Sequence, residues 1–345
     1  MATMDIFNSD AFSMVSLTDA LEKTPYKPQF LGGINIFESK PQRTEAIAIE
    51  ERNGALALIQ TSERGAAPKQ RTNEKRNIRD FRTVRIAKSD TLYAHELQNI
   101  RGFGQESELQ QVQEEINRRQ ADLRDDMELT HEHMRLGAVQ GILLDADGSV
   151  IRNWFDEFGI TQPTEQNFAL TTDTTDVRGK CQAIIRAMRR ASKGAWLPST
   201  QVHALCGDSF FDKLIAHDHV RDTYLSWAQA QELRDNLAFQ SFPFGGIMFH
   251  NYRGTDDFDD SATSGTGIVG VKTTKAKFFP VGARGVFQVA WSPAETFDYA
   301  NTPGMPVYSM LIPDEKRNAY VELEEYSYPL HICTRPGMLQ RAKQA

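Results

Sequence analysis

Cysteine is scarce in this chain, and the few cysteines present are not spaced for a covalent role. The 345 residues include three, Cys181, Cys206 and Cys333, which lie far apart. Disulfide frameworks use even numbers of cysteines and zinc sites use close pairs, so the pattern indicates neither. We therefore expect the chain to fold in a reducing compartment such as a cytosol.

Long apolar runs are absent as well. No segment approaches the roughly 18 apolar residues that a membrane-spanning helix requires. The segment from Met1 to Asp10 also lacks the basic start and apolar stretch of a secretory signal. The sequence therefore predicts a soluble protein that has no membrane partner.

Positive charge is not in excess. The net charge is −7, whereas a protein whose main task is to grip nucleic acid carries a concentrated basic surface. The hydrophobic fraction of 40% and the charged fraction of 25% are those of an ordinary globular protein, which argues against a disordered chain. The length permits a sizeable core and two domains.

Motifs for catalysis or metal binding are also missing. The His-Glu-His triplet at 131–133 has its histidines two residues apart, so on a helix they point about 200° from one another. We predict a polar helix surface at this position. The Asp-Ala-Asp-Gly sequence at 145–148 resembles part of a calcium loop but lacks the distal glutamate, and a hairpin turn explains it.

Two further segments resemble binding motifs, but the sequence around them does not support a site. Residues 265–270 match the glycine string of dinucleotide-binding folds, but they follow an Asp-rich loop and open no convincing helix. The segment therefore lacks the helix N-terminus at which this motif binds a pyrophosphate. The four aspartates between 256 and 260 are typical of a solvated loop. We predict no catalytic, cofactor-binding or metal site.

The most regular segment is a predicted helix over residues 105–136. Apolar or small side chains recur at threes, fours and sevens, at Leu109, Val112, Ile116, Leu123, Met127, Thr130 and Met134. No glycine or proline occurs before Gly137, and at ~1.5 Å per residue the helix is on the order of 48 Å long. Its single narrow stripe, interrupted by Arg119, indicates that most of its surface faces water or a polar partner. A short coiled coil is the alternative.

The first hundred residues carry strand patterns, but they show little sign of packing into a core of their own. Residues 45–61 and 76–88 are predicted to be the two legs of a long hairpin, joined by loop residues 62–75. Two strands alone are marginal in water. The hairpin therefore indicates a segment that other copies of the same chain hold in place.

The N-terminal segment, residues 1–40, contains a cluster of large apolar side chains. They are Phe30, Leu31, Ile34, Ile36 and Phe37. Leaving five such side chains in water is unfavourable. We interpret the segment as an arm that docks on another surface, with an ordinary N-terminal linker as the alternative.

The remainder of the chain alternates helix and strand. Residues 142–151 predict a strand, an Asp-Gly turn and a second strand. Helical faces alternate with strands between about 173 and 285, and residues 319–333 predict one long strand before a short tail. The predicted fold class is α+β.

Three parts of the chain carry a family resemblance. Residues 12–37 combine a Pro-Tyr-Lys-Pro sequence with Phe30 and Leu31, and residues 95–104 lead into the long helix. Near the C-terminus stand residues 279–282, 294–296 and 329–338. In order and spacing these parts resemble the major capsid protein of tailed bacteriophages, in the branch that includes the lambda-type head protein, over essentially the whole chain.

The resemblance implies the tailed-phage major capsid fold and a structural role without enzyme activity. The implied domains are an N-terminal arm at 1–44, an extended β-hairpin loop at 45–92, a peripheral domain at 93–172 and 286–345 with the spine helix 105–136, and an axial domain at 173–285. Copies of the chain would assemble through pentamers and hexamers into an icosahedral shell around double-stranded DNA.

The resemblance also implies partners and a location. The partners would be the chain itself, a separate scaffolding protein, a portal and a decoration protein, with DNA packaged without sequence specificity. The location would be the virion capsid, and the host cytoplasm during assembly. Two alternatives remain: an encapsulin-like shell of a cellular compartment, and a soluble α+β enzyme that uses His131 or residues 256–260.

Opposite charges on the hairpin and the helix predict contacts between copies. Residues 69–88 carry a net charge of +6 and residues 105–136 a net charge of −5. In the implied fold these parts meet across subunits, and exposed ion pairs contribute ~0.2–1 kcal/mol each. The predicted inter-subunit contact residues are Arg71, Lys75, Arg76, Arg79 and Arg82 on the hairpin, and Glu114, Asp122 and Asp125 on the helix.

Overall fold

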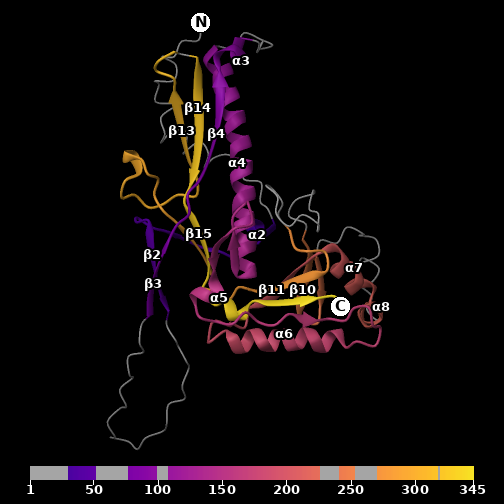
Figure 1. Ribbon diagram of the computed structural model, residues 1–345. Coiled ribbons are helices and arrows are strands. Elements are labelled where there is room, and N and C mark those ends of the chain that lie inside the picture. The colour runs from indigo at the N-terminus through magenta and orange to yellow at the C-terminus, as the bar shows by residue number, and fades with distance from the viewer. Residues whose placement is uncertain (1–29, 52–76, 99–107, 226–240, 253–269, 318) are drawn as a thin grey trace, which may run out of the picture. The chain divides into compact units, whose positions relative to one another are not determined.

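The computed structural model describes residues 30–51, 77–98, 108–225, 241–252, 270–317 and 319–345 (Figure 1). These residues form both helices and sheets, which agrees with the predicted α+β class. None of the helices within these ranges is long and apolar enough to cross a membrane. The chain divides into two compact units, of which unit 1 comprises Met1–Ile47, Phe81–Glu132 and Val289–His331, and unit 2 comprises Ala48–Asp80, His133–Gln288 and Ile332–Ala345.

Unit 1 is built on a three-stranded antiparallel sheet beside a long helix. The sheet has the order β13-β14-β4, with β13 (Tyr308–Pro313), β14 (Tyr320–Ser327) and β4 (Ile86–Tyr93). The helices are α2 (Phe30–Ile34), α3 (Ala94–Gln98) and α4 (Glu108–Gln140), whose last turns belong to unit 2. Figure 1 shows β4 and β14 running along α4.

Helix α4 confirms the predicted long helix and continues four residues beyond its predicted end, while residues 105–107, where the prediction begins, lie outside the described ranges. The stripe residues Ile116, Leu123, Met127 and Met134 are all buried. Gly137 does not end the helix, because the chain continues helically to Gln140. The end comes at Gly141, whose φ of +83° is the left-handed conformation that favours glycine after a helix.

The predicted hairpin is present, but its second leg is two strands. β2 (Ala46–Glu51) and β3 (Asn77–Arg82) form a two-stranded sheet, while residues 52–76 lie outside the described ranges. β3 ends at Arg82, and the residues from Ile86 onward belong to β4. The reason is the ladder to β14, which pairs every residue of β4 in register. The domain boundaries implied by the resemblance stay predictions.

The predicted long strand at 319–333 is likewise two strands in two sheets. β14 ends at Ser327, and β15 (Pro329–Cys333) joins β1 (Glu38–Pro41) and β12 (Phe287–Trp291) in the order β1-β12-β15. Apolar alternation continues through the junction, so the pattern alone could not reveal that the chain changes partners at Tyr328.

Unit 2 contains a six-stranded mixed sheet with the order β7-β16-β11-β8-β10-β9. The strands are β7 (Gln166–Asn167), β8 (Gln201–Cys206), β9 (Ser241–Phe244), β10 (Ile247–Asn251), β11 (Lys275–Val281) and β16 (Gln340–Lys343). The helices are α5 (Trp154–Glu157), α6 (Val177–Ala191), α7 (Asp208–Ala216) and α8 (Asp218–Leu225), and a 3-10 turn, η4, spans Pro336–Met338.

The core of unit 2 joins one face of this sheet to α6 and α7. Every second residue of β8 points into it, starting at Val202, and α6 contributes an apolar stripe from Val177 to Met188. On α7, Phe210 is buried in this core, while Ile215 is 38% exposed. Alternation in the strand and the 3.6-residue period in the helices together account for this core.

The predicted Asp-Gly turn is confirmed by the two strands that flank it. β5 (Ile142–Leu144) and β6 (Val150–Asn153) pair around the turn, where the N–H of Asp145 donates to the carbonyl of Ser149 over 2.9 Å. The three cysteines are free and buried. Burial raises the pKa of Cys181, and likewise of Cys333, to about 12, so both remain uncharged thiols.

Candidate functional site

The predicted contact residues are divided by the structure into three groups. Arg71, Lys75 and Arg76 lie outside the described residues. Arg79 and Arg82 lie on β3. The carboxylates lie on α4, where their side chains are exposed, at Glu114, Asp122 and Asp125.

The two arginines of β3 differ in what they already touch. The Arg79 guanidinium lies 5.5 Å from the ring centroid of Phe158, a cation–π contact within unit 2. Arg82 Nη1 is 3.9 Å from Glu45 Oε1, and both side chains are about three-quarters exposed. A pair so open to water is weak. Arg82 is therefore the better candidate for a contact with another copy.

Much of the acidic charge of α4 is neutralised inside the chain. Asp122 accepts a hydrogen bond from Arg118 over 3.2 Å, and Glu128 lies 3.5 Å from Arg124. Asp126 pairs with Lys88 of β4. The net charge of −5 already includes Arg118 and Arg124, so of these three pairs only the one with Lys88 lowers the net charge that the helix offers a neighbour.

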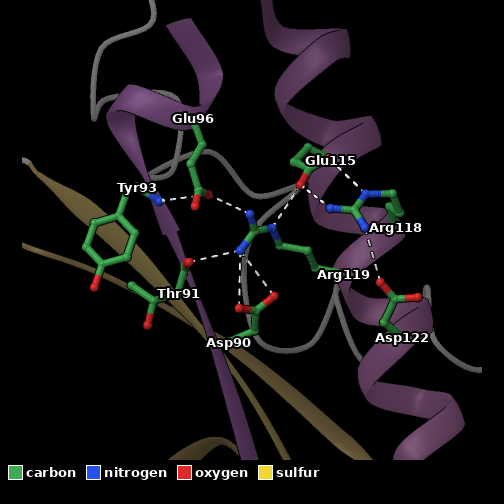
Figure 2. A network of polar contacts seen from close by, with 8 residues as sticks. All are labelled: Asp90, Thr91, Tyr93, Glu96, Glu115, Arg118, Arg119 and Asp122. Atoms are coloured by element: carbon green, nitrogen blue, oxygen red, sulfur yellow. Dashed lines mark hydrogen bonds and ion pairs between the residues drawn. The ribbon is translucent and has the colours of Figure 1, made fainter. Parts of the chain in front are cut away.

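Arg119 is the centre of a polar network that joins three elements (Figure 2). Its side chain is 13% exposed. Nη1 donates to both carboxylate oxygens of Asp90 at 3.2 Å and to the Thr91 carbonyl at 2.9 Å. Nη2 donates to Glu96 at 2.6 Å and Nε donates to Glu115 at 2.9 Å. The guanidinium fork thus ties the end of β4 and the start of α3 to the long helix.

The network keeps its central carboxylate ionised. Hydrogen bonds from Arg118, and then from Arg119, lower the pKa of Glu115 to about 2, although partial burial opposes the shift. The sequence marked Arg119 as an interruption of the apolar stripe. That interruption was the available signal for the network. An arginine at a buried stripe position has five N–H donors, so it needs several acceptors close by.

The His-Glu-His triplet on α4 is not the polar surface that was predicted. His131 and Glu132 are each 1% exposed and His133 is half-buried. Glu132 accepts hydrogen bonds from the backbone N–H groups of Leu31, at 2.7 Å, and of Gly32, at 3.1 Å. The prediction was wrong because α2, about a hundred residues earlier in the chain, covers this side of α4.

The same contact bears on the predicted arm. Leu31 is fully buried in the chain's own unit 1, so this part of the cluster docks on the chain's own helix. His131 places Nε2 2.9 Å from the hydroxyl of Ser327, and its ring lies 5.3 Å from that of Trp291. Within the described ranges, no group of three or more histidine, cysteine, aspartate or glutamate side chains is arranged to hold a metal ion.

Comparison with known proteins assigns the family. The family model for phage major capsid protein E matches residues 13–344. This chain belongs to that family. The chain is 24% identical over 354 residues to the major capsid protein of Salmonella phage Felix O1, with 95% of each protein covered. It is 25% identical over 348 residues to the major capsid protein of Pseudomonas phage KPP10, with 97% of each covered.

Solved structures agree on the fold. The crystal structure of a prophage protein from E. coli CFT073, described as a capsid protein, superposes with a TM-score of 0.53 at 12% identity. The superposition covers 96% of this chain and 99% of the prophage protein. The predicted resemblance to tailed-phage major capsid proteins is confirmed. The chain is a structural capsid protein of the virion and not an enzyme, and neither the compartment-shell nor the enzyme alternative is favoured.

Proposed function

We propose that copies of this chain assemble through pentamers and hexamers into an icosahedral shell that encloses the double-stranded DNA genome of a tailed phage or prophage. The observation that carries the proposal is the family match over residues 13–344. Strands β2 and β3 support it, because they pair only with each other within the described residues. Two strands of this kind are marginal alone and gain from a neighbouring copy.

The proposal includes further partners. A separate scaffolding protein would direct assembly in the host cytoplasm, a portal would replace one pentamer, and a decoration protein would bind the finished lattice. The packaged DNA would be contacted without sequence specificity.

The decisive test is the assembly state of the purified chain, alone and with its scaffolding protein. Size-exclusion chromatography with light scattering should show megadalton particles, and negative-stain microscopy should show closed shells or rings of five and six subunits. A chain that stays monomeric or dimeric in both conditions would contradict the proposal.

We also propose that the basic hairpin contacts the acidic helix of a neighbouring copy. The set comprises Arg71, Lys75, Arg76, Arg79 and Arg82 against Glu114, Asp122 and Asp125. Arg82 and Glu114 are its strongest members, because both are exposed and, in the part of the chain that the structure describes, neither has a partner as close as the Arg118 that engages Asp122. Each pair contributes little, but the contact repeats in every subunit of a shell.

A charge-reversal series tests this contact. Arg76→Glu with Arg82→Glu should abolish shells while leaving the circular dichroism spectrum of the subunit unchanged. Adding Glu114→Arg should restore part of the assembly, because the exchanged charges attract again. As a control, Arg221→Glu changes an exposed arginine of α8 and should assemble normally. Normal shells from the double variant would exclude the contact.

A further inference from the structure

Helix α6 of unit 2 carries charge of one sign only. It contains five basic residues and no acidic residue, although the net charge of the chain is −7. Its apolar stripe from Val177 to Met188 is buried in the core of unit 2. Four arginines of the helix are exposed: Arg178, Arg186, Arg189 and Arg190. We call these four side chains the arginine stripe.

The arginine stripe lies on the side of α6 that is turned away from the core. At 3.6 residues per turn its four positions fall within about 120° of one another around the helix axis. From Arg178 to Arg190 the stripe is ~18 Å long, at 1.5 Å per residue. In Figure 1, α6 lies beneath β10 and β11, at the lower border of unit 2. The positive charge therefore follows one surface of this unit.

The arginines of the stripe have no acidic partner in the described part of the chain. No carboxylate there lies within ion-pair distance of any of the four. Arg189 instead lies over the ring of Trp196, 5.5 Å from its centroid. Other arginines of unit 2 differ, since Arg152 is 3.4 Å from Glu157 and Arg221 is 2.6 Å from Asp218. The described carboxylates therefore leave the charge of the stripe without a counterion.

The stability of the helix explains only one end of the stripe. Arg189 and Arg190 lie in the last turn, where the helix dipole favours positive charge. Arg178 lies in the first turn, where the same dipole disfavours a cation. Arg186 and Arg190 are four residues apart, and like charges at this spacing repel. Arg178 and Arg186 therefore indicate a role toward a partner outside the chain.

The side chains between the arginines indicate the chemistry of that partner. On this side of the helix lie Gly179, Gln182 and Ala183, and none of these is a large apolar residue. Protein interfaces are anchored by large apolar or aromatic side chains, which the stripe lacks. Contacts to a nucleic-acid backbone need positive charge instead, and the guanidinium fork matches the oxygens of a phosphate.

We infer that the arginine stripe of α6 binds the phosphate backbone of the double-stranded DNA that the shell encloses. A duplex presents on the order of ten phosphate charges over ~18 Å, so several arginines can each meet a phosphate. Contacts to phosphates carry no sequence information, which suits a shell that holds every part of a genome. The inference rests on the proposed function and names the surface that contacts the DNA.

The binding of purified subunits to a short, fluorescently labelled duplex tests the stripe. Arg178→Gln with Arg186→Gln should weaken binding about tenfold at low salt. It should also reduce the slope of log affinity against log salt by about 2, since each phosphate contact contributes ~0.9. Arg152→Gln with Arg221→Gln removes the same charge from arginines that have acidic partners, and should bind like the wild type. Equal binding by the two double variants overturns the inference.

Thermal unfolding shows whether the two arginines stabilise the fold instead. Arg178→Gln with Arg186→Gln should unfold at the wild-type temperature or slightly above it, because a cation leaves the first turn. A clearly lower unfolding temperature would assign the stripe a structural role and overturn the inference. If the wild-type subunits bind polyglutamate but not the duplex, the partner is an acidic protein segment and the inference also fails.

Assembled particles separate this inference from the proposed function. Shells of the variant Arg178→Gln with Arg186→Gln should form normally but retain less DNA than wild-type shells. If this variant fails to assemble, the stripe belongs to a contact between copies and the inference is overturned. A wild-type chain that binds the duplex through the stripe but forms no shells would contradict the proposed function alone.

Discussion

The backbone N–H of Leu31 donates to Oε1 of Glu132 over 2.7 Å, across 101 residues of sequence. The second carboxylate oxygen accepts the N–H of Gly32. A buried carboxylate that accepts two backbone donors is a charge-assisted contact, so removing it leaves those donors without their acceptor. The pair joins the N-terminal segment to the long helix within unit 1.

Glu132→Gln should lower the free energy of unfolding by about 1–3 kcal/mol, because the amide presents N–H donors to one of the two backbone N–H groups. Glu132→Ala should cost at least as much, since both donors then lose their partner. Urea titration followed by circular dichroism measures the change. Glu114→Gln, exposed on the same helix, should stay within about 0.5 kcal/mol of the wild type. Equal effects of the two glutamine variants would contradict the anchoring role.

Arg119→Lys should destabilise unit 1 despite keeping the charge. An ammonium has three donors at one point and cannot reach Asp90, Glu96 and Glu115 together, whereas the guanidinium fork does. We expect a loss of about 1–3 kcal/mol in the free energy of unfolding. Arg118→Lys is the matched control, since that side chain is 59% exposed, and it should be nearly neutral.

Glu325 should make stability depend on pH in the neutral range. It is fully buried, neither oxygen has a hydrogen-bond partner within the described residues, and burial raises the pKa of Glu325 to about 8, with Arg124 opposing the shift. The fold therefore favours the protonated form, and the free energy of unfolding should fall as pH rises from about 4.5 to about 8. The slope is at most ~1.4 kcal/mol per pH unit.

Glu325→Gln should remove this slope, because an amide cannot ionise. Denaturant titrations at pH 6, 7 and 8 measure it. Glu322→Gln changes a half-buried residue on the other face of the same strand and should retain the slope. An unchanged pH dependence in Glu325→Gln would show that another group controls it.

Gly141→Ala should be more costly than Gly159→Ala, although both glycines have positive φ. A Cβ at Gly141 would lie 2.4 Å from the ring of Phe155, whereas a Cβ at Gly159 would meet nothing within 4 Å. The left-handed conformation costs roughly 1–2 kcal/mol at either site, and the clash adds about 1–3 kcal/mol at Gly141. Thermal unfolding of the two variants compares them, and equal losses would mean that Phe155 moves aside freely.

Helices and turns could be predicted from the sequence where residues close together along the chain determine the conformation. The stripe from Ile116 to Met134 predicted the long helix because its period is a property of the helix alone. The Asp-Gly turn at 145–148 was equally local. The ends of these elements were less predictable, because the predicted helix ends before Gly137, whereas the chain stays helical through Gln140 and φ becomes positive at Gly141.

The helical and strand periods of this chain were sufficient to predict its α+β class, and its resemblance to tailed-phage major capsid proteins predicted the family that the comparisons then showed. Only the tertiary structure decided which polar residues lie inside, because their partners are remote in sequence. Glu132 is buried since α2 brings two backbone donors to it, and Arg119 fits an apolar stripe since β4 and α3 supply its acceptors. A buried charge is stable only where such partners are present, and folding alone brings them together.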